Sequence, residues 1–369
     1  MQSVDLSNYV PECKITIVND NGKLEPRDFL SSVQIDEKIG NVAEFNLVLA
    51  DPFDIKSQKF TMLNGSLFRP ETKVGVSIGY VKKLEKMIDG KINSISTSGF
   101  TSDIPKLTIV GYDISHNLLT QDSIGNGSIK IEKNDTYSDI ADKIADTSGL
   151  KGKEVDTTKL YSPIIIKKPI SCIEFLKDVT KRVGFEFFVA RNSLFFINPR
   201  ILKQRVGNDT MKFKWGTNLV KFTPSLNISD IIPGVIIRGH LPDSKKQIIK
   251  EANSQDEDTW EEKNTKASEL AIKLHKKKKE ITDKVFSTEE EASDMAKAEL
   301  NMANDNLITG SGTVIGAPTL SPGQFIELDD LSEWFSGKYF VTGVSHTFDS
   351  NGFITNFSVR KNTIGGEIM

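Results

Sequence analysis

Histidine, cysteine and acidic residues are the side chains here that could support acid–base, nucleophilic or metal chemistry. The sequence contains no HExxH, GxSxG or Walker motif, and no GxGxxG follows a strand pattern. No pair of acidic residues stands out as a glycosidase dyad. The histidines and cysteines also lack the spacing of a zinc site; they are His116, His240, His275, His346, Cys13 and Cys172. We therefore predict no catalytic, cofactor-binding or metal-binding residue, no cofactor and no enzymatic activity.

Two stretches could bind a ligand without performing chemistry. The first is a basic run that could hold phosphates, formed by Lys276, Lys277, Lys278 and Lys279. Acidic Glu280 and Asp283 follow it closely, which indicates a solvated face.

The second stretch, residues 129–150, resembles the opening of a LysM module, in which a strand leads into Asp-Thr and a helix. Asp135 and Thr136 occupy that position, ahead of Tyr137 and Ile140. A capped helix after a strand explains the same residues. Peptidoglycan binding by a LysM-like cell-wall module of a tail-associated protein stays open as the alternative function.

Composition limits the class of protein. The 369 residues suggest two or three domains, and 26% charged with 38% hydrophobic residues is ordinary for a globular chain. A net charge of −3 makes nucleic acid an unpromising first partner. The two cysteines are expected to be reduced, as in the cytosol. Residues 1–5 show no signal-peptide pattern, and no apolar stretch approaches the ~20 residues of a membrane helix.

The first third of the chain has the pattern of short strands separated by turn formers. Period-2 alternation or β-branched residues mark the predicted strands at 15–18, 45–49, 74–80, 92–96 and 106–110. Strands at this spacing indicate a barrel or sandwich.

The middle of the chain changes to helical periodicity. A helix is predicted over residues 136–148, ending at Gly149. A second begins at Ser171, where Glu174 completes a capping box, and ends at Gly184. Strands at 185–189 and 194–197 follow, so residues 117–205 are predicted to form a small α/β domain.

The remaining chain returns to strands around a charged segment. Strands are predicted at 228–238 and across 308–361, with a helix from Ser287. Residues 241–284 are rich in Lys, Glu and Asp, so we predict a solvated connector there rather than core.

Two hairpin regions share a weak echo. Gly90-Lys91 followed by Gly99-Phe100 is matched by Gly337-Lys338 followed by Gly352-Phe353. Glycine-rich hairpins converge easily, so duplication and chance both remain open.

The C-terminal pattern is more specific. A Pro-Gly turn and a strand lead to Ser336-Gly337-Lys338-Tyr339-Phe340-Val341, and then to His346-Thr347-Phe348 and an aromatic-Thr strand. This resembles the end of the hub domain in phage late control D proteins, VgrG proteins of type VI secretion and hubs of extracellular contractile injection systems. The motif residues, with structural roles only, are Gly316, Pro322, Gly323, Gly337, Tyr339, Val341, His346 and Phe348.

The motif residues have expected mechanical roles. Pro322-Gly323 suits a type II turn, and Gly337 is expected to end a hairpin loop. Tyr339, Val341 and Phe348 are expected to alternate into a barrel core. Residues 107–119 and 171–188 also resemble the family, in its first-barrel exit and its middle α/β domain.

The resemblance implies a mainly β fold with an α+β insertion, made of two tube-like β-barrels and a small mixed α/β domain. The expected domains are a first barrel at 1–116, the α/β domain at 117–205, a second barrel at 206–240 plus 285–362, a charged connector at 241–284 and a tail at 363–369.

The resemblance also implies a baseplate hub that acts as a homotrimeric symmetry adapter. Three chains with two barrels each would join a hexameric inner tube to a trimeric spike. Because the chain stops after the hub pattern, the spike protein is expected to be separate. Other baseplate proteins are further partners, the hub does not insert into membranes, and nucleic acid is at most cargo in the channel. Synthesis and assembly are expected in the bacterial cytoplasm, and the final location in a phage tail or injection particle.

Overall fold

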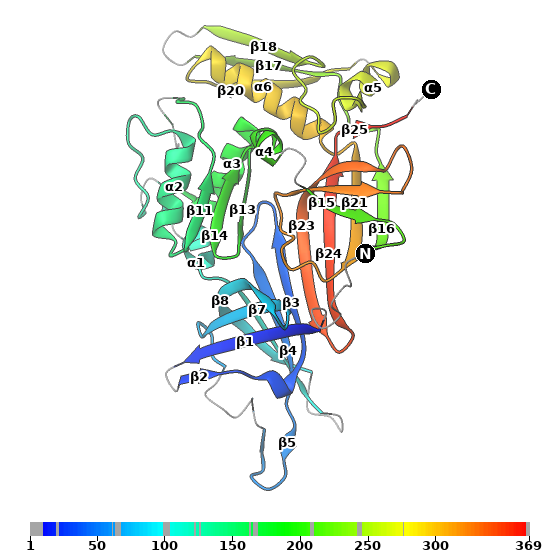
Figure 1. Cartoon of the computed structure of the whole chain (residues 1–369). Helices are drawn as coiled ribbons and strands as arrows, with labels where there is room; N and C mark the ends of the chain where they lie inside the picture. The colour runs from blue at the N-terminus through cyan, green and yellow to red at the C-terminus, as the bar shows by residue number, and fades with distance from the viewer. Residues whose placement is uncertain are drawn as a thin grey trace.

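β-Strands dominate the computed structural model of the chain, as the sequence predicts (Figure 1). The structure describes residues 10–19, 22–60, 62, 68–98, 104–121, 123–124, 127–161, 164, 169–206, 210–241, 246–275 and 277–366. Expectations placed on residues 1–5, Gly99, Phe100, Lys276 and 367–369 lie outside the described residues.

The first β unit curls around one apolar core. Phe45, Leu47 and Leu49 alternate inward along β4 and are fully buried, as a half-buried strand requires. A small hairpin, β5 (Phe53–Asp54) with β6 (Lys59–Phe60), projects from this unit (Figure 1). The strands pair in the order β3-β4-β9-β8-β7-β1-β2. Their bounds are β1 (Pro11–Asn19), β2 (Gly22–Leu24), β3 (Leu30–Lys38), β4 (Glu44–Ala50), β7 (Lys73–Tyr80), β8 (Lys83–Thr97) and β9 (Lys106–Asp113), with a 3-10 helix at Arg27–Phe29.

Strand β3 was not among the strands that the sequence pattern predicts. Its inward positions are Val33, Ile35 and Glu37, so a carboxylate stands where a third apolar residue would complete the alternation. Glu37 is nevertheless 1% exposed. The strand that the pattern missed is therefore one with a charged group in its core-facing row.

The α/β unit confirms the predicted capped helices. Thr136 caps α2 in a capping box with Asp139, and Ser171 caps α3 in the same way with Glu174. Gly184 ends α3 with φ +69°. β14 pairs parallel with β11 and antiparallel with β13. The elements are α1 (His116–Gln121), β10 (Ser123–Ile124), α2 (Tyr137–Thr147), β11 (Gly152–Val155), β12 (Ile170–Ser171), α3 (Cys172–Val183), β13 (Glu186–Ala190), β14 (Ser193–Ile197) and α4 (Pro199–Val206).

The second β unit joins the first through a shared sheet. The carboxyl-terminal half of β23 pairs antiparallel with β3, from Gly343 opposite Lys38 to Asp349 opposite Ser32. One sheet therefore runs through both units, side by side in Figure 1. The strands are β15 (Met211–Lys214), β16 (Leu219–Leu226), β21 (Ile308–Ile315), β22 (Phe325–Asp329), β23 (Gly337–Asp349) and β24 (Gly352–Lys361).

Residues 241–284 differ from the expected charged connector. They contain β18 (Gln247–Asn253), β19 (Thr265–Lys266), α5 (Ala267–Leu274) and β20 (Lys279–Val285), and they bury Trp260 and Leu270. The expectation was wrong because many of the charges occupy exposed positions of these elements, such as Glu251 of β18 and Glu280 of β20, while a few apolar side chains fill cores.

The strand expected near residues 228–238 also has a different partner. It is β17 (Gly234–His240), and it pairs with β18 and β20 rather than with the second β unit. Helix α6 (Glu289–Asn304) packs on this three-stranded sheet and on α3, at the top of Figure 1. β25 (Thr363–Ile364) then pairs with β19. We refer to β17, β18, β19, α5, β20 and α6, with the segments that connect them, and β25 as the cap unit.

The two β units repeat one strand order. The first runs β1-β7-β8-β9-β4-β3, and the second runs β15-β22-β23-β24-β21-β16, with strands in the same chain order. Counted in this sheet order, the third strands are β8 and β23, and each carries a bulge against the fourth strand, at Ile92/Ser94 and at Val341/Gly343. The sixth strands are β3 and β16, and each carries a bulge against the fifth strand, at Leu30/Ser32 and at Leu219/Lys221. One difference is that β1 and β7 are antiparallel, whereas β15 and β22 are parallel.

Matching bulges make residue equivalences possible. Ser94 corresponds to Gly343, and Ser32 corresponds to Lys221. The repeated order and both repeated bulges favour duplication over chance for the weak sequence echo.

Candidate functional site at the junctions between units

The loop after β21 requires glycine at Gly316. An added Cβ at this position would lie 2.1 Å from the Phe353 ring, whose side chain belongs to the core of the first unit. The Gly316 carbonyl accepts a hydrogen bond of 2.8 Å from the Tyr80 hydroxyl of β7. The first motif glycine therefore lets the loop lie directly against the neighbouring unit.

Pro322 and Gly323 face the α/β unit at the other end of this loop. Gly323 has φ +82°, the value that the third position of a type II turn requires. An added Cβ would lie 2.7 Å from the Phe188 ring of β13, and the Gly323 amide donates to the Val341 carbonyl at 2.9 Å. Pro322 lines a recess together with Phe188.

The amino-terminal half of β23 packs in the second core. Tyr339 and Val341 are fully buried there, and the Tyr339 hydroxyl donates to the Phe335 carbonyl at 2.8 Å. Gly337 has φ +120°, and an added Cβ would lie 2.6 Å from the Lys361 ammonium and the Glu261 carboxylate. These residues therefore close the end of the second unit.

Beyond its bulge, β23 turns its inward row toward the first unit. Phe348 is half-buried against the core of the first unit, so it does not share a core with Tyr339 and Val341. His346 lies opposite Ile35 of β3 and is completely buried. The motif thus spans two cores, whereas the sequence pattern predicted a single one.

The buried Glu37 and the partly buried Arg191 lie close together where the two β units and the α/β unit meet. Burial raises the pKa of Glu37 to about 7, although the nearby Arg191 guanidinium opposes this. Ser321 donates to one Glu37 oxygen at 3.2 Å, and Arg191 donates to the carbonyls of Pro318 and Leu320. Arg191 lies in the turn between β13 and β14, so one cation holds the loop of residues 316–323, called the motif loop below, against β3.

His346 completes this junction from β23. Its Nε2 lies 3.0 Å from the Leu320 carbonyl and its Nδ1 lies 3.1 Å from the Thr355 hydroxyl. Burial, followed by the charge of Arg191, lowers the pKa of His346 to about 3. His346 is therefore neutral near pH 7, with Nε2–H donating to Leu320. The residue therefore positions the loop through these two hydrogen bonds.

A second buried ionic junction joins the α/β unit, the cap unit and β24. Arg200 of α4 contacts Asp305 at 2.6 Å, and Arg360 of β24 contacts Glu186 at 2.6 Å and Asp305 at 3.4 Å. Arg200 also lies over the buried Trp260 ring, 4.6 Å from its centroid. Asp305 is fully buried, so its charge must be balanced by these two arginines.

The next residue along β24 extends the second junction. Lys361 is fully buried, and its ammonium contacts Glu261 and donates to the Ser336 carbonyl, both at 2.7 Å. It lies 5.5 Å from the Tyr339 ring centroid. Burial lowers the pKa of Lys361, while Glu261 opposes that change. The lysine therefore ties the hairpin of the second unit to the cap unit.

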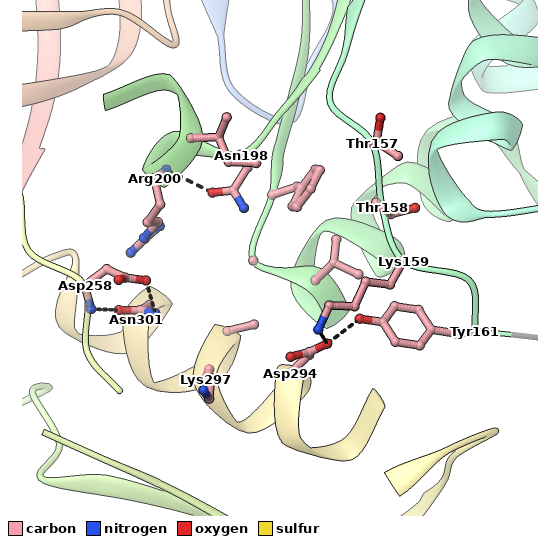
Figure 2. Close-up of a pocket in the computed structure, with 15 residues that line it drawn as sticks. Thr157, Thr158, Lys159, Tyr161, Asn198, Arg200, Asp258, Asp294, Lys297 and Asn301 are labelled. Atoms are coloured by element: carbon pink, nitrogen blue, oxygen red, sulfur yellow. Dashed lines mark hydrogen bonds and ion pairs between the residues drawn. The ribbon is translucent and has the colours of Figure 1, made fainter. Parts of the chain in front are cut away.

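A cavity of about 280 Å³ lies between the α/β unit and helix α6 (Figure 2). On one side, Lys159 and the Tyr161 hydroxyl both contact Asp294 of α6, at 2.8 and 2.6 Å. Burial, followed by the hydrogen bond to Asp294, raises the pKa of Tyr161. The protonated Tyr161 hydroxyl donates to Asp294, so this cluster connects the α/β unit to α6.

Chemistry is not evident in the rest of the described chain. Across the described ranges, no group of three His, Cys, Asp or Glu residues could hold a metal. Cys13 and Cys172 are buried, and burial raises the pKa of Cys13 to about 12, so it stays a protonated thiol. Among the same residues, no helix is long and apolar enough to cross a membrane.

Sequence reasoning missed the residues that form the second ionic junction. Arg200, Asp305, Arg360 and Lys361 have no motif spacing, because their contacts connect four distant segments. A usable signal was present in β24, whose inward row places Lys361 after Phe357 and Val359. A charge in an otherwise apolar row marks a paired buried group.

Comparison with known proteins identifies the fold. The family described as "Alg8 N-terminal domain" matches residues 11–350. The structure is similar to the 43 kDa tail protein of prophage MuSo2 from Shewanella oneidensis, with a TM-score of 0.70 and 14% identity over 95% of this chain and 99% of that one. A tail protein from Neisseria meningitidis gives a TM-score of 0.66 and 14% identity over 97% and 98% of the two chains.

A third similar structure comes from a secretion machine. An E. coli protein described as a component of the type VI secretion system gives a TM-score of 0.51 and 10% identity over 97% of this chain and 79% of that one. No curated protein matches the sequence. The resemblance drawn from the C-terminal motif, to phage tail and type VI secretion proteins, is confirmed at the level of fold.

Proposed function

The chain belongs to the family described as the Alg8 N-terminal domain and has the fold of phage tail proteins, and on this premise we propose that it is a structural baseplate hub. In this proposal three copies form a symmetry adapter between a hexameric inner tube and a separate trimeric spike. The hub performs no catalysis and meets other baseplate proteins at its periphery. It is made in the bacterial cytoplasm and ends in a tail or injection particle.

The observation that carries this proposal is the repeated β unit. Each chain presents two units with one strand order and the same two bulges. Three chains would place six similar units in a ring, so a threefold object could stack on a sixfold tube with nearly equivalent contacts. The other surfaces of the chain are not repeated and would keep threefold symmetry toward the spike.

The buried junctions support a load-carrying part rather than an enzyme. Glu37, Arg191 and His346 fix the motif loop between units, and Asp305 fixes the cap unit to β24. Such contacts leave the units little freedom to move, which suits a rigid adapter. The peptidoglycan-binding alternative gains no support, because α2 leads into β11 and not into a second helix as a LysM module would.

The native mass of the purified chain tests the proposal. Light scattering, with and without a cognate spike protein, should show a species near three times the chain mass of 41.0 kDa. A strict monomer under both conditions, or a stable dimer, would contradict the adapter.

A further inference from the structure

The intrachain contact between the two β units shows how such units dock. Strand β3, the last in the order of the first unit, pairs with the carboxyl-terminal half of β23, the third strand of the second unit. Seven residue pairs form this contact, from Gly343–Lys38 to Asp349–Ser32. The rule is that the sixth strand of one unit adds to the exposed half of the third strand of another.

The equivalent edges on the outer sides of the chain have no such neighbour. Within the residues that the structure describes, Ser94, Ile95 and Ser96 of β8 pair with β9 on one side and with no strand on the other. The outer edge of β16 is likewise unpaired among the described strands. Six strands separate β16 from β8, which corresponds to about 34 Å along the sheet, so the two edges lie at opposite ends of this run of strands.

We propose that β16 of one copy pairs antiparallel with the Ser94–Ile95–Ser96 edge of β8 in a second copy. Transferring the intrachain register through the matched bulges places Ser94 opposite Asn227, Ile95 opposite Leu226 and Ser96 opposite Ser225. This inference rests on the hub function proposed above and gives it a specific interface.

The side chains at these edges suit the contact. Ile95 is half-buried against the first core and Leu226 is half-buried against the second, so pairing them would extend both cores across the interface. At the intrachain junction the same two positions hold Val344 and the buried Glu37. Val220 and Ile228, which flank the β16 edge, are 54% and 41% exposed. A second copy on this edge would shield these apolar side chains from water.

The contact is heterologous, because the two copies use different edges. Repeating such a contact from copy to copy gives a closed ring if the rotations between neighbouring copies add up to a full turn, and an open filament if they do not. Pro224 limits its strength, since proline cannot donate a ladder hydrogen bond and therefore occupies an edge strand here. The ladder is thus shorter than the intrachain one, and we expect association to depend on protein concentration.

Cysteine cross-linking in the full chain tests the register. Residues directly opposite in antiparallel strands have Cβ atoms about 4.5–5.5 Å apart, which permits a disulfide after a small adjustment. The variant Ser96→Cys/Ser225→Cys, oxidised at high concentration, should give a band series ending at the trimer. Both serines are exposed, so folding of the chain should be unaffected.

Matched controls separate the proposed contact from random oxidation. Mixing Ser96→Cys with Ser225→Cys should give dimers only, and each single variant alone should stay monomeric, since Cys13 and Cys172 are buried. Asp36→Cys/Ser345→Cys, opposite each other within one chain, should form an intrachain disulfide without a change of mass. Ser96→Cys/Thr223→Cys, displaced by two residues, should cross-link at least fivefold less.

The outcomes distinguish this interface from the hub function. A trimer in light scattering without the Ser96–Ser225 cross-link would overturn the strand pairing and leave the hub intact. Absence of both the trimer and the cross-link would overturn both proposals. A ladder that continues beyond the trimer would show an open filament and overturn the closed ring.

Discussion

The two β units share a framework but fill its centre from different strands. In the first unit, Phe45 of β4 lies over Gly90 of β8 and Gly111 of β9, where added Cβ atoms would lie 2.8 and 2.4 Å from its ring. In the second unit the residue equivalent to Phe45 is Gly310, and the residue equivalent to Gly90 is Tyr339.

Each centre is therefore filled by aromatic rings, but from different strands. Tyr339 stands edge-on to Phe222, with ring centroids 5.6 Å apart, and an added Cβ at Gly310 would lie 2.6 Å from Phe222. Close packing requires this exchange, because a large ring on one strand needs glycine on its neighbours. Strand order and bulges therefore define the unit, and individual core residues do not.

The largest expected effect comes from breaking the second core at Tyr339. Tyr339→Asp would place a carboxylate at a fully buried position, and should lower the free energy of unfolding by on the order of 5 kcal/mol. Tyr339→Phe, which removes only the hydrogen bond to Phe335, should cost about 1 kcal/mol. Urea denaturation measures both. Unchanged stability of the Asp variant would contradict the placement of Tyr339 in the core.

The second prediction concerns charges that the first unit does not share. The residue equivalent to Arg360 is Tyr112, so the first unit has no counterpart of the Arg200–Asp305–Arg360 junction. Asp305→Ala would leave both arginines buried without this partner and should cost about 3–5 kcal/mol in denaturant unfolding.

An exposed ion pair provides the control for Asp305→Ala. Asp146→Ala removes the contact with Lys153. The side chains of Asp146 and Lys153 are 67% and 38% exposed, so the change in stability should be less than about 1 kcal/mol. Equal losses in the two variants would show that burial of Asp305 does not set its contribution.

The sequence predicted local elements better than their partners. The capped helices α2 and α3 and most strands of the first unit followed from periodicity and capping residues, which act within a few positions. The assignment of β17 failed, because its partners β18 and β20 lie in the segment that charge composition marked as a connector. Pairing between distant strands leaves no local signal.

The junctions were less predictable than the fold. The motif named His346 and both loop glycines, yet Glu37 and Arg191, which hold the loop between those glycines, come from other units. The repeat left little trace in the sequence, for the reason seen at Phe45 and Tyr339. Large and small residues have exchanged strands, so equivalent positions carry different residues although both cores are filled.

The third prediction tests a position at which the units differ in charge. Glu37 corresponds to Leu226, and burial raises the pKa of Glu37 from 4.5 to about 7. The folded state therefore holds this proton more tightly than the unfolded state. The associated stability is complete below about pH 4.5 and is lost as pH rises through 7.

Glu37→Gln isolates this effect. The stability of the natural chain minus that of the variant should fall by roughly 3 kcal/mol between pH 4.5 and pH 8. His346, with its pKa lowered to about 3, contributes in the opposite sense, losing stability as pH falls from 6.5, but it is present in both proteins and cancels. A difference that is independent of pH would mean that Glu37 titrates normally.

The smallest effect tests the exchange of volume directly. Gly312 lies under Phe357 in the second unit, and the equivalent cross-strand pair in the first unit is Leu47 with Ile109. An added Cβ at Gly312 would lie 2.1 Å from the Phe357 ring, which supplies its three nearest atoms. Gly312→Leu alone should therefore cost about 2 kcal/mol through overpacking.

Combining Gly312→Leu with Phe357→Ile installs the pair of the first unit in the second. Because the smaller Ile side chain vacates the space that Leu needs, the double variant should recover about 1 kcal/mol relative to the sum of the two single changes. A double-mutant cycle in urea measures this coupling. Zero coupling would mean that the units share strand order without sharing a packing scheme. Positive recovery would show that the two solutions are interchangeable at this position because the bulged framework holds the backbone in the same place.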